Sequence, residues 1–373
     1  MQVTEKKSVP RLRFKDDNGG DFPDWEKKKL GEVALFLDDK RIPLSQDERS
    51  SRKGPYPYYG ASGIIDYVDD YLFDGEFVLL GEDGANIVTR STKLAFVIRG
   101  KNWVNNHAHV LQAYGSVSFL AESLERINYG PYNSGTAQPK LNAKTCKRIL
   151  LNFPTLPEQR KIANFLSSVD KQIEQLTQKK SLLEQYKKGA TQQIFSQQIR
   201  FKDDDGGDFP DWEEKKLGDV LVIGSGRDYK HLGKGTIPVY GSGGLMTYVN
   251  DQLYMGESVC IGRKGTIDSP LFLDGAFWTV DTLFYTHSFK NVLPRFLFAV
   301  FQRVNWRKYN EASGVPSLSK GTIEKIPVSI PATGEQTKIA NFLSALDRKI
   351  ETVASQIAEM QTFKRGLLQQ MFV

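Results

Sequence analysis

The side chains that most often carry out chemistry do not combine into a catalytic or metal-binding pattern in this sequence. His107 and His109 have a spacing that two metal ligands could use, but no third ligand lies nearby, and a structural role is expected for the pair. The acidic runs at 16–21 and 203–208 resemble calcium loops but lack the glutamate that such a loop carries at its twelfth position. GxxxxGK[ST] phosphate loops, GxGxxG turns, GxSxG elbows and the Asn/Asp-Pro-Pro-Tyr/Phe motif of amino-methyltransferases do not occur. The sequence therefore predicts no catalytic residue and no metal site.

The remaining chemistry is that of binding. Polar and basic side chains gather beside glycine turns in both halves of the chain. Arginine pairs with guanine and asparagine or glutamine with adenine in the DNA major groove, while lysine and serine often contact phosphates. Each such residue alone is more often a solvated surface residue, so the prediction depends on the whole set. The candidate DNA-binding residues are Arg41, Lys53, Tyr58, Tyr59, Ser62, Arg90, Asn105, Asn106, His107, Gln138 and Lys140 in the first half, and Arg227, Lys230, His231, Tyr240, Ser242, Arg263, Lys264, Ser317, Ser319 and Lys320 in the second.

Length and composition set the class of protein. The 373 residues are 40% hydrophobic and 25% charged, which is typical of a soluble globular protein with two or three domains. A formal net charge of +6 suits a nucleic-acid binder, although it also suits many enzymes. No run of about 18 apolar residues predicts a membrane span, and the N-terminus lacks a secretory signal. With Cys146 and Cys260 expected to be ordinary thiols, the sequence predicts a cytoplasmic protein.

The chain is an internal duplication. Residues 13–33 and 200–220 are identical at 18 of 21 positions, and residues 154–195 and 331–372 at 18 of 42. Between these matched segments the halves agree only sparsely. A neutral tandem duplication is the simpler explanation, but it should diverge evenly along its length. The contrast favours a shared frame that carries two domains of different binding specificity.

Each second matched segment predicts a long helix with a coiled-coil seam. Apolar residues recur at alternating steps of three and four, with Lys180 and Lys187 as interruptions. Thr155 and Glu158 have the spacing of a capping box. Gly189 and Gly366 predict a close backbone approach or a break, because glycine destabilises a helix. The predicted seam comprises Ile162, Leu166, Val169, Ile173, Leu176, Leu183, Ile339, Leu343, Leu346, Ile350, Val353, Ile357 and Met360.

These elements predict two tandem α/β (α+β) domains joined by two long helices in an antiparallel coiled coil. If the two chain ends meet, the arrangement is circular and pseudo-two-fold. The alternative is that each helix packs on its own domain. The predicted boundaries are an N-terminal frame segment at 1–24, recognition domain 1 at 25–153, a central helical spacer at 154–199, a repeated frame segment at 200–211, recognition domain 2 at 212–330 and a C-terminal helical spacer at 331–373.

Paired motifs in the two halves give the chain a resemblance to a known family. It resembles the DNA-specificity subunit of type I restriction-modification systems over almost its whole length. One departure lies at the second helix opening, where Gly334 and Thr337 replace Pro157 and Arg160. The motifs are Trp25-Glu-Lys-Lys-Lys-Leu-Gly-Glu-Val and Trp212-Glu-Glu-Lys-Lys-Leu-Gly-Asp-Val, Tyr59-Gly-Ala-Ser-Gly and Tyr240-Gly-Ser-Gly-Gly, Ser134-Gly-Thr-Ala-Gln-Pro-Lys-Leu and Ser313-Gly-Val-Pro-Ser-Leu-Ser-Lys, and Pro157-Glu-Gln-Arg-Lys-Ile-Ala and Gly334-Glu-Gln-Thr-Lys-Ile-Ala.

The resemblance implies a non-catalytic subunit that binds double-stranded DNA. Each recognition domain would read one half of an asymmetric, split site, and the coiled coil would set the spacing between the halves. Two modification subunits would methylate adenine N6 with S-adenosylmethionine. Two restriction subunits would use ATP and Mg²⁺. The chain itself would bind no cofactor, and no membrane would be involved.

Two other functions remain open on the residues alone. The chain could be an enzyme with two divergent active sites for a phosphorylated or acidic substrate, since its pI and glycine loops suit one. It could also be a scaffold that joins proteins through its coiled coil without nucleic acid. The first would need an acid/base or metal cluster, and the second would be excluded by salt-sensitive DNA binding.

Overall fold

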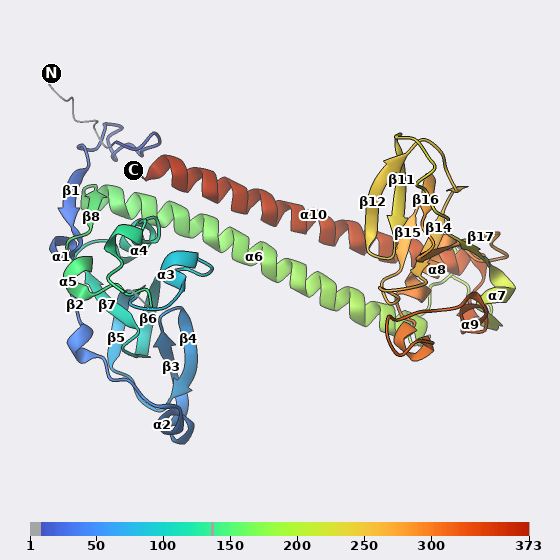
Figure 1. The fold of residues 1–373 in the computed structure, drawn as a ribbon, viewed down its shortest axis with the longest axis horizontal. Helices are drawn as coiled ribbons and strands as arrows, with labels where there is room; N and C mark the ends of the chain where they lie inside the picture. Colours follow the sequence, from blue (N-terminus) through green and yellow to red (C-terminus); the bar gives the residue numbers. More distant parts are fainter. Residues whose placement is uncertain (1–8, 136–137, 373) are drawn as a thin grey trace. The chain divides into compact units, whose positions relative to one another are not determined.

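The structure is a computed structural model and describes residues 9–135 and 138–372. The first eight residues of the predicted N-terminal frame segment, Thr136 and Ala137 of the first domain-exit motif, and the last residue of the C-terminal spacer lie outside the described residues. The chain forms two compact units (Figure 1). Unit 1 contains residues 1–176 and 356–373, and unit 2 contains residues 177–355.

Unit 1 is built around a six-stranded sheet with the strand order β2-β7-β5-β6-β3-β4 (Figure 1). All neighbouring strands are antiparallel except β3 and β6. A separate antiparallel pair, β1 with β8, joins the start of the domain to its end. The elements are β1 (Glu26–Lys29), α1 (Leu30–Val33), β2 (Ala34–Phe36), η1 (Asp38–Lys40), α2 (Gln46–Ser51), β3 (Lys53–Gly60), β4 (Gly63–Val68), β5 (Phe73–Gly81), α3 (Asn86–Thr89), β6 (Ala95–Val104), β7 (Ala108–Ala113), α4 (Val117–Glu125), η2 (Gly130–Tyr132), α5 (Ala143–Cys146) and β8 (Leu150–Phe153).

Unit 2 repeats this plan with the sheet divided into two four-stranded parts, β10-β17-β14-β15 and β12-β11-β16-β13. Strands β18 and β9 pair as β8 and β1 do. The elements are β9 (Glu213–Lys216), α7 (Leu217–Val220), β10 (Val222–Ser225), β11 (Ile237–Gly241), β12 (Gly244–Val249), β13 (Tyr254–Met255), β14 (Ser258–Gly262), β15 (Leu271–Leu273), β16 (Ala276–Thr279), β17 (Leu283–His287), α8 (Pro294–Phe301), η3 (Trp306–Tyr309), α9 (Lys320–Glu324) and β18 (Pro327–Ile330).

A pair of glycines bends the sheet at the same place in both units. In unit 1, Gly75 faces Gly100 across the β5–β6 ladder, and both have positive φ angles, of 138° and 72°. In unit 2, Gly256 and Gly275 hold the same place, with φ angles of 130° and 91°, and the Gly256 N–H donates to the Gly275 carbonyl over 3.0 Å. Only glycine adopts such angles without strain, so both sheets bend here while the strand order is kept.

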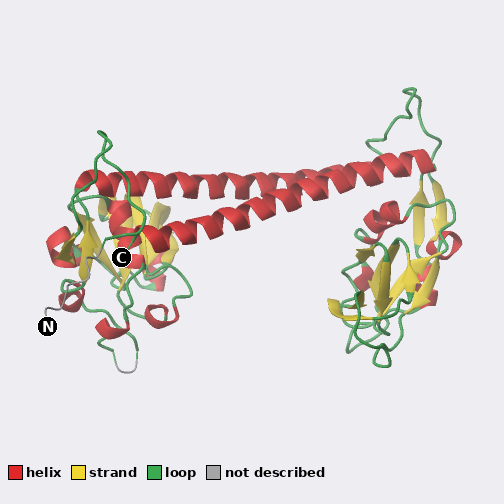
Figure 2. Cartoon of the chain, turned by 90° about the horizontal axis from the view of Figure 1, so that it is seen from above, coloured by secondary structure: helices red, strands yellow, loops and turns green. Residues whose placement is uncertain are grey.

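The two long helices are α6 (Leu156–Phe195), with 40 residues, and α10 (Thr333–Met371), with 39, and each is continuous (Figure 2). In unit 1 the start of α6 packs against the end of α10, where Lys364 Nζ lies 2.6 Å from Asp170 Oδ1. In unit 2 the end of α6 packs against the start of α10, where Lys187 Nζ lies 2.5 Å from Asp347 Oδ1. This reversed order of contacts makes the pair antiparallel, and the prediction of an antiparallel pair is confirmed.

The seam residues point inward, as the heptad pattern predicts. Lys180 and Lys187, which interrupt the apolar pattern of α6, are half-buried in the same stripe, and Lys364 occupies the matching place in α10. The stripe also packs on the globular domains, so both packing partners considered for the helices are used. Ile162, Leu166, Val169, Ile339, Leu343, Leu346 and Val353 are buried, and Ile173, Leu176, Leu183, Ile350, Ile357 and Met360 are half-buried.

The expectation for Gly189 and Gly366 is wrong. Neither glycine interrupts its helix, and a Cβ atom built at either position would meet nothing within 4 Å. Both lie outside the close contacts of the seam, so no backbone approach requires them. The intrinsic cost of a glycine is about 1 kcal/mol, which the buried seam on either side outweighs.

Each frame segment is fixed to the start of the long helix that follows its domain. In unit 1, the buried carboxylate of Glu158 accepts from the Arg13 guanidinium at 2.7 and 2.9 Å and from the Trp25 indole N–H at 3.2 Å. In unit 2, the carboxylate of Glu335 accepts hydrogen bonds from the Arg200 guanidinium at 2.7 and 3.2 Å and from the Trp212 indole N–H at 3.1 Å. The hydrogen bond to the glutamate raises the pKa of each arginine. The repeated sequence thus encodes a repeated clamp.

The described segments nearest the two chain ends meet within unit 1. The Leu12 N–H donates to the Gln370 carbonyl over 3.0 Å. Phe372, at the end of α10, stacks on Phe119 and contacts the edge of Trp25. At the end of α6, Phe195 makes the matching contacts with Phe296 and Trp212 in unit 2. The predicted closure of the frame is confirmed by these contacts.

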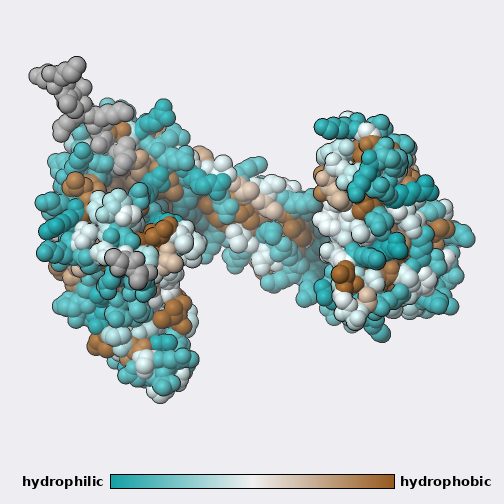
Figure 3. All heavy atoms as spheres, viewed as in Figure 1, coloured by the Kyte–Doolittle hydropathy of each residue, from teal (hydrophilic) through white to brown (hydrophobic). Residues whose placement is uncertain are grey.

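Hydrophilic residues dominate the face shown in Figure 3, where hydrophobic residues form small patches. Among the described residues, none of the helices has the length and apolar character needed to cross a membrane.

Candidate nucleic-acid interface

Four loops of unit 1 meet at one edge of its sheet. The Glu82 N–H donates to the His107 carbonyl over 2.8 Å, and the Leu141 N–H donates to the Glu82 carbonyl over 2.7 Å. The Asn105 N–H donates to the Tyr59 carbonyl over 3.0 Å, which brings in the β3–β4 hairpin. These backbone bonds join segments that are far apart in sequence, so side chains on the loops share one rigid surface.

A group of buried and half-buried charges supports this surface. Arg41 Nη1 lies 2.8 Å from Glu82 Oε2 and 2.7 Å from the Ala108 carbonyl oxygen. His109, almost fully buried, lies 2.6 Å from Asp38 Oδ2 through Nδ1 and 2.8 Å from the Leu141 carbonyl through Nε2. Paired charges of this kind hold a loop in one geometry, because an alternative position would leave a charge buried without a partner.

The Asp38–His109 pair has a defined protonation state. Burial lowers the pKa of His109, but the hydrogen bond that its ring donates to Asp38, with a smaller contribution from Cys146 and the charge of Asp38, raises it overall to about 10. Burial raises the pKa of Asp38, but the hydrogen bond and charge of His109, the charge of Arg41 and the Val110 N–H together lower it below its ordinary value. At neutral pH the pair is therefore an imidazolium with a carboxylate.

This pair predicts a pH-dependent stability for unit 1. Because the folded pKa of His109 is raised from 6.5 to about 10, its contribution is complete below pH 6.5 and is lost as the pH rises towards 10. We expect the denaturation midpoint of unit 1 to fall across this range. Substituting His109→Gln removes the titrating group and should flatten the dependence. An equal fall in the wild type and H109Q would contradict the assignment.

Unit 2 builds the same loop scaffold with different side chains. The Arg263 N–H donates to the Thr282 carbonyl over 2.8 Å, and the Leu318 N–H donates to the Arg263 carbonyl over 2.9 Å. A one-residue bridge pairs Lys264 with Ser317, as Asp83 pairs with Lys140 in unit 1. By these bonds Arg263 and Lys264 correspond to Glu82 and Asp83. One scaffold therefore presents acidic residues in unit 1 and basic residues in unit 2.

A cavity of about 420 Å³ opens beside the basic loop of unit 2. Three cations line it, Arg263, Lys264 and Lys320, against one carboxylate, Glu311. Glu311 accepts hydrogen bonds from the Thr322 and Ser319 hydroxyls, which lower its pKa. The cavity therefore has an excess of positive charge, as a site for DNA requires.

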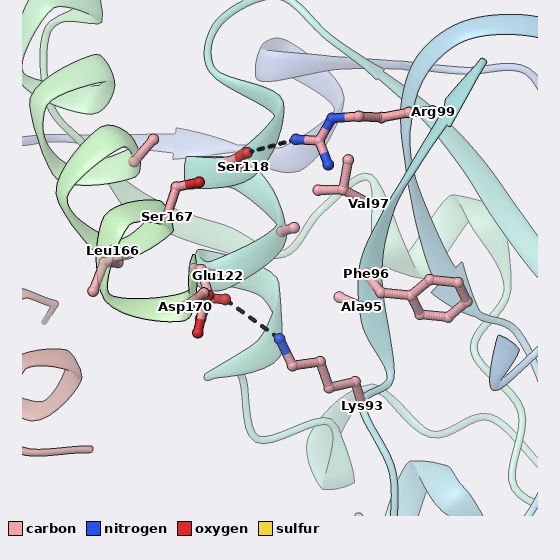
Figure 4. Close-up of a pocket in the computed structure, with 12 residues that line it drawn as sticks. Lys93, Ala95, Phe96, Val97, Arg99, Ser118, Glu122, Leu166, Ser167 and Asp170 are labelled. Carbon is pink, nitrogen blue, oxygen red and sulfur yellow. Dashed lines mark hydrogen bonds and ion pairs between the residues drawn. The ribbon is translucent and has the colours of Figure 1, made fainter. Parts of the chain in front are cut away.

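A different hollow, in unit 1, has balanced charge (Figure 4). It has a volume of about 330 Å³ and lies between β6, α4 and α6. Lys93 pairs with Glu122 at 3.5 Å, Arg99 with Glu76 at 2.8 Å, and Asp170 with Lys364 at 2.6 Å (the first pair is drawn in Figure 4). These pairs neutralise its charged lining, so it does not resemble a phosphate site.

The structure places the candidates of the first half in three groups. Tyr58 is 1% exposed and its hydroxyl accepts from the Leu44 N–H, so its place in the core argues against contact with DNA. Arg41, Arg90 and Asn105 are held by interactions within the protein, Arg90 by an ion pair with Glu125 at 2.7 Å. The remaining residues are exposed or half-exposed on loops and strand ends. They are Lys53, Tyr59, Ser62, Asn106, His107, Gln138 and Lys140.

The candidates of the second half are more accessible. Five of them line the cavity beside the basic loop: Arg263, Lys264, Ser317, Ser319 and Lys320. Ser319 is also the N-cap of α9, since its hydroxyl accepts from the Thr322 N–H. The other candidates are exposed or half-exposed on the loop after β10 and on the β11–β12 hairpin. They are Arg227, Lys230, His231, Tyr240 and Ser242.

His107 and His109 have different environments, because only His109 belongs to a strand. His107 lies just before β7 and is exposed, with its Nδ1 2.9 Å from Asp83, whereas His109 lies within β7 and is buried. Among residues 9–135 and 138–372, no three His, Cys, Asp or Glu residues are placed to hold a metal ion.

Sequence reasoning missed the acidic residues of this surface, Asp38, Glu82 and Asp83. Acidic side chains were not considered, because the candidates were chosen among the residue types that contact DNA. Position in the repeat could have identified two of them. Glu82 and Asp83 lie between Gly81 and Gly84, where the other half has Arg263 and Lys264 between Gly262 and Gly265.

Comparisons with known proteins agree with this architecture. A family model described as the type I restriction modification DNA specificity domain matches residues 23–185 and 210–362. The chain is 27% identical over 367 residues to the putative type I restriction enzyme specificity subunit S.HindORF215P of Haemophilus influenzae, covering 91% of this chain and 90% of that protein. It is 21% identical to the type I restriction enzyme MjaVIII specificity subunit of Methanocaldococcus jannaschii, covering 95% and 94%.

Solved structures show the same fold. The crystal structure of a type I restriction-modification S subunit from M. genitalium matches with a TM-score of 0.70 at 16% identity, covering 98% of this chain and 99% of that one. A structure from work on complex assembly and conformational transition of the type I R-M system matches with a TM-score of 0.53 at 15% identity, covering 94% and 98%.

Proposed function

Since the chain belongs to the type I restriction-modification DNA-specificity family, whose members have a non-catalytic role in recognising DNA sequence, we propose that each of its two units reads one half of a bipartite DNA site. The observation that carries the proposal is the pair of loop scaffolds with matched backbone hydrogen bonds and unlike side chains. Because the loop backbones of the two units are alike, both units can lie on DNA in the same orientation. Because their side chains differ, they select different bases. The site is therefore asymmetric.

The long helices have the features needed to set the distance between the half-sites. Each is continuous through both units, and the seam is buried or half-buried along its length. A helix of about 40 residues measures about 60 Å, or somewhat less than two turns of B-DNA. The same coiled coil docks the partners of this chain.

The chemistry belongs to those partners. We assign adenine N6 methylation with S-adenosylmethionine to two modification subunits, and ATP- and Mg²⁺-dependent restriction to two further subunits. The sequence of this chain holds no motif for gripping a flipped adenine, so extrusion of the target base is a task for the modification subunit.

A domain exchange tests the proposal. Residues 34–153 are replaced by the corresponding segment of another family member, the complex is reconstituted with its modification subunits, and methylated adenines are mapped by sequencing. We expect one half of the methylated motif to change and the other to stay. The matched exchange of residues 221–330 should change the other half only. If both halves survive both exchanges, the units do not read the site.

A further inference from the structure

The basic loop of unit 2 is held in one conformation by backbone hydrogen bonds. Besides the bonds of Arg263 to Thr282 and Leu318, the Gly265 N–H donates to the Pro316 carbonyl over 2.9 Å. Unit 1 repeats this with Gly84 and Pro139 at 3.1 Å. Because the backbone is fixed on both sides, the side chain after Gly262 leaves the scaffold from a defined point.

The Arg263 side chain is exposed and largely uncommitted. The side-chain hydrogen bond that it makes within the described residues, from Nη1 to the Asp281 carbonyl, is long at 3.4 Å, and its guanidinium lies 6.0 Å from the Phe284 ring. Within the described part of the chain, none of the three cations Arg263, Lys264 and Lys320 forms an ion pair with a carboxylate. Three cations beside one cavity repel one another, and an anionic ligand with acceptor atoms would relieve that repulsion.

The equivalent residue of unit 1 is already used within the protein. Glu82 pairs with Arg41 at 2.8 Å and with Lys140 at 3.4 Å, and it is 13% exposed. The same backbone position thus carries a half-buried, paired carboxylate in one unit and an exposed guanidinium in the other. This difference is large enough to give the two units different base preferences.

The three cations have different geometries. A guanidinium presents a planar fork that matches the O6 and N7 acceptors of guanine, whereas an ammonium is a point charge suited to phosphate. Building on the function proposed above, we propose that Arg263 reads a guanine in the half-site bound by unit 2, while Lys264 and Lys320 hold the neighbouring phosphates. Unit 1, with Glu82 at this place, does not read guanine through the equivalent residue.

The test uses the full chain reconstituted with its modification subunits and a DNA library randomised in the half-site assigned to unit 2 by the domain exchange. We expect a guanine in the wild-type motif at one position. Arg263→Gln and Arg263→Lys should each lower the preference for that guanine by about 5- to 150-fold, with the other half-site unchanged. Lys264→Gln and Lys320→Gln should weaken binding equally for all sequences and reduce the salt dependence by about one ion each.

Arg295→Gln is the matched control, because Arg295 is an exposed arginine of unit 2 that pairs with Glu257 at 2.7 Å and Asp274 at 3.3 Å. It should leave the motif unchanged. The proposal is overturned if the half-site of unit 2 contains no guanine, if R263Q keeps the wild-type motif, or if R263Q weakens all sequences equally. Loss of sequence-dependent methylation by the wild-type complex itself would instead overturn the proposed function.

Discussion

Substituting Glu158→Ala is expected to destabilise unit 1 by about 3–5 kcal/mol, because it removes one partner of a buried ion pair and leaves the other charge uncompensated. The Glu158 side chain is fully buried and that of Arg13 is only 15% exposed, so water cannot replace the lost carboxylate well. The Trp25 indole N–H would lose its acceptor at the same time. Glu158→Gln, which removes the charge but keeps one of the two acceptor oxygens, should cost less.

Hydrogen exchange resolved by peptide is the measurement, since it reports each unit separately. Protection should fall in unit 1 for E158A and in unit 2 for Glu335→Ala, which breaks the matching contacts with Arg200 and Trp212. Glu174→Ala, at an exposed position of α6, is the control and should change stability by less than about 0.5 kcal/mol. If E158A and E174A give the same protection, the clamp does not stabilise unit 1.

The role of Glu158 shows where local sequence rules stop. The spacing of Thr155 and Glu158 predicts a capping box, in which the carboxylate would serve the first turn of its own helix. In the structure that carboxylate binds Arg13 and Trp25, more than 130 positions earlier in the chain. A pattern of neighbouring residues contains no information about such a partner. The internal repeat did contain it, since arginine, tryptophan and glutamate recur together in the second half.

The frame could be predicted because it repeats and because its helices are periodic. A heptad stripe specifies a partner stripe, and two matching stripes in one chain specify each other. The sequences between the repeated segments differ in the two halves and have no heptad periodicity, so neither guide was available there. The neighbouring residues Tyr58 and Tyr59 show this, because alternation along a strand predicts that they face opposite ways but does not say which one faces the core. That choice is made by packing against Leu44 and Trp103, which are distant in sequence.

Residue types indicate which side chains could contact DNA, but not which of them are already engaged within the protein. By residue type alone, Arg41 and Arg263 are equally good candidates for reading a guanine. The structure separates them, because Arg41 is committed to Glu82 and to the Ala108 carbonyl while Arg263 is exposed beside a cavity. Ion pairs between distant residues decide which basic side chains remain available, and single-sequence patterns do not show those pairs.

Closure of the frame gives a second large effect. Phe372 is buried against Phe119 and Trp25 at ring distances of 5.3 and 6.3 Å, and Arg126 lies 5.5 Å from its ring. Phe372→Ala removes this aromatic group from the core of unit 1 and should cost about 3–5 kcal/mol. Denaturation followed by peptide-resolved exchange should place the loss in unit 1, at the last turn of α10 and around Trp25.

Phe363→Ala is the control on the same helix, because Phe363 is 50% exposed and its loss should cost less than about 0.5 kcal/mol. The counterpart Phe195→Ala, which removes contacts with Trp212 and Phe296, should weaken unit 2 and spare unit 1. This pair of results would show that the last residues of α10 close unit 1 in the way that the end of α6 closes unit 2. Equal effects of F372A and F363A would mean that the chain end contributes nothing to unit 1.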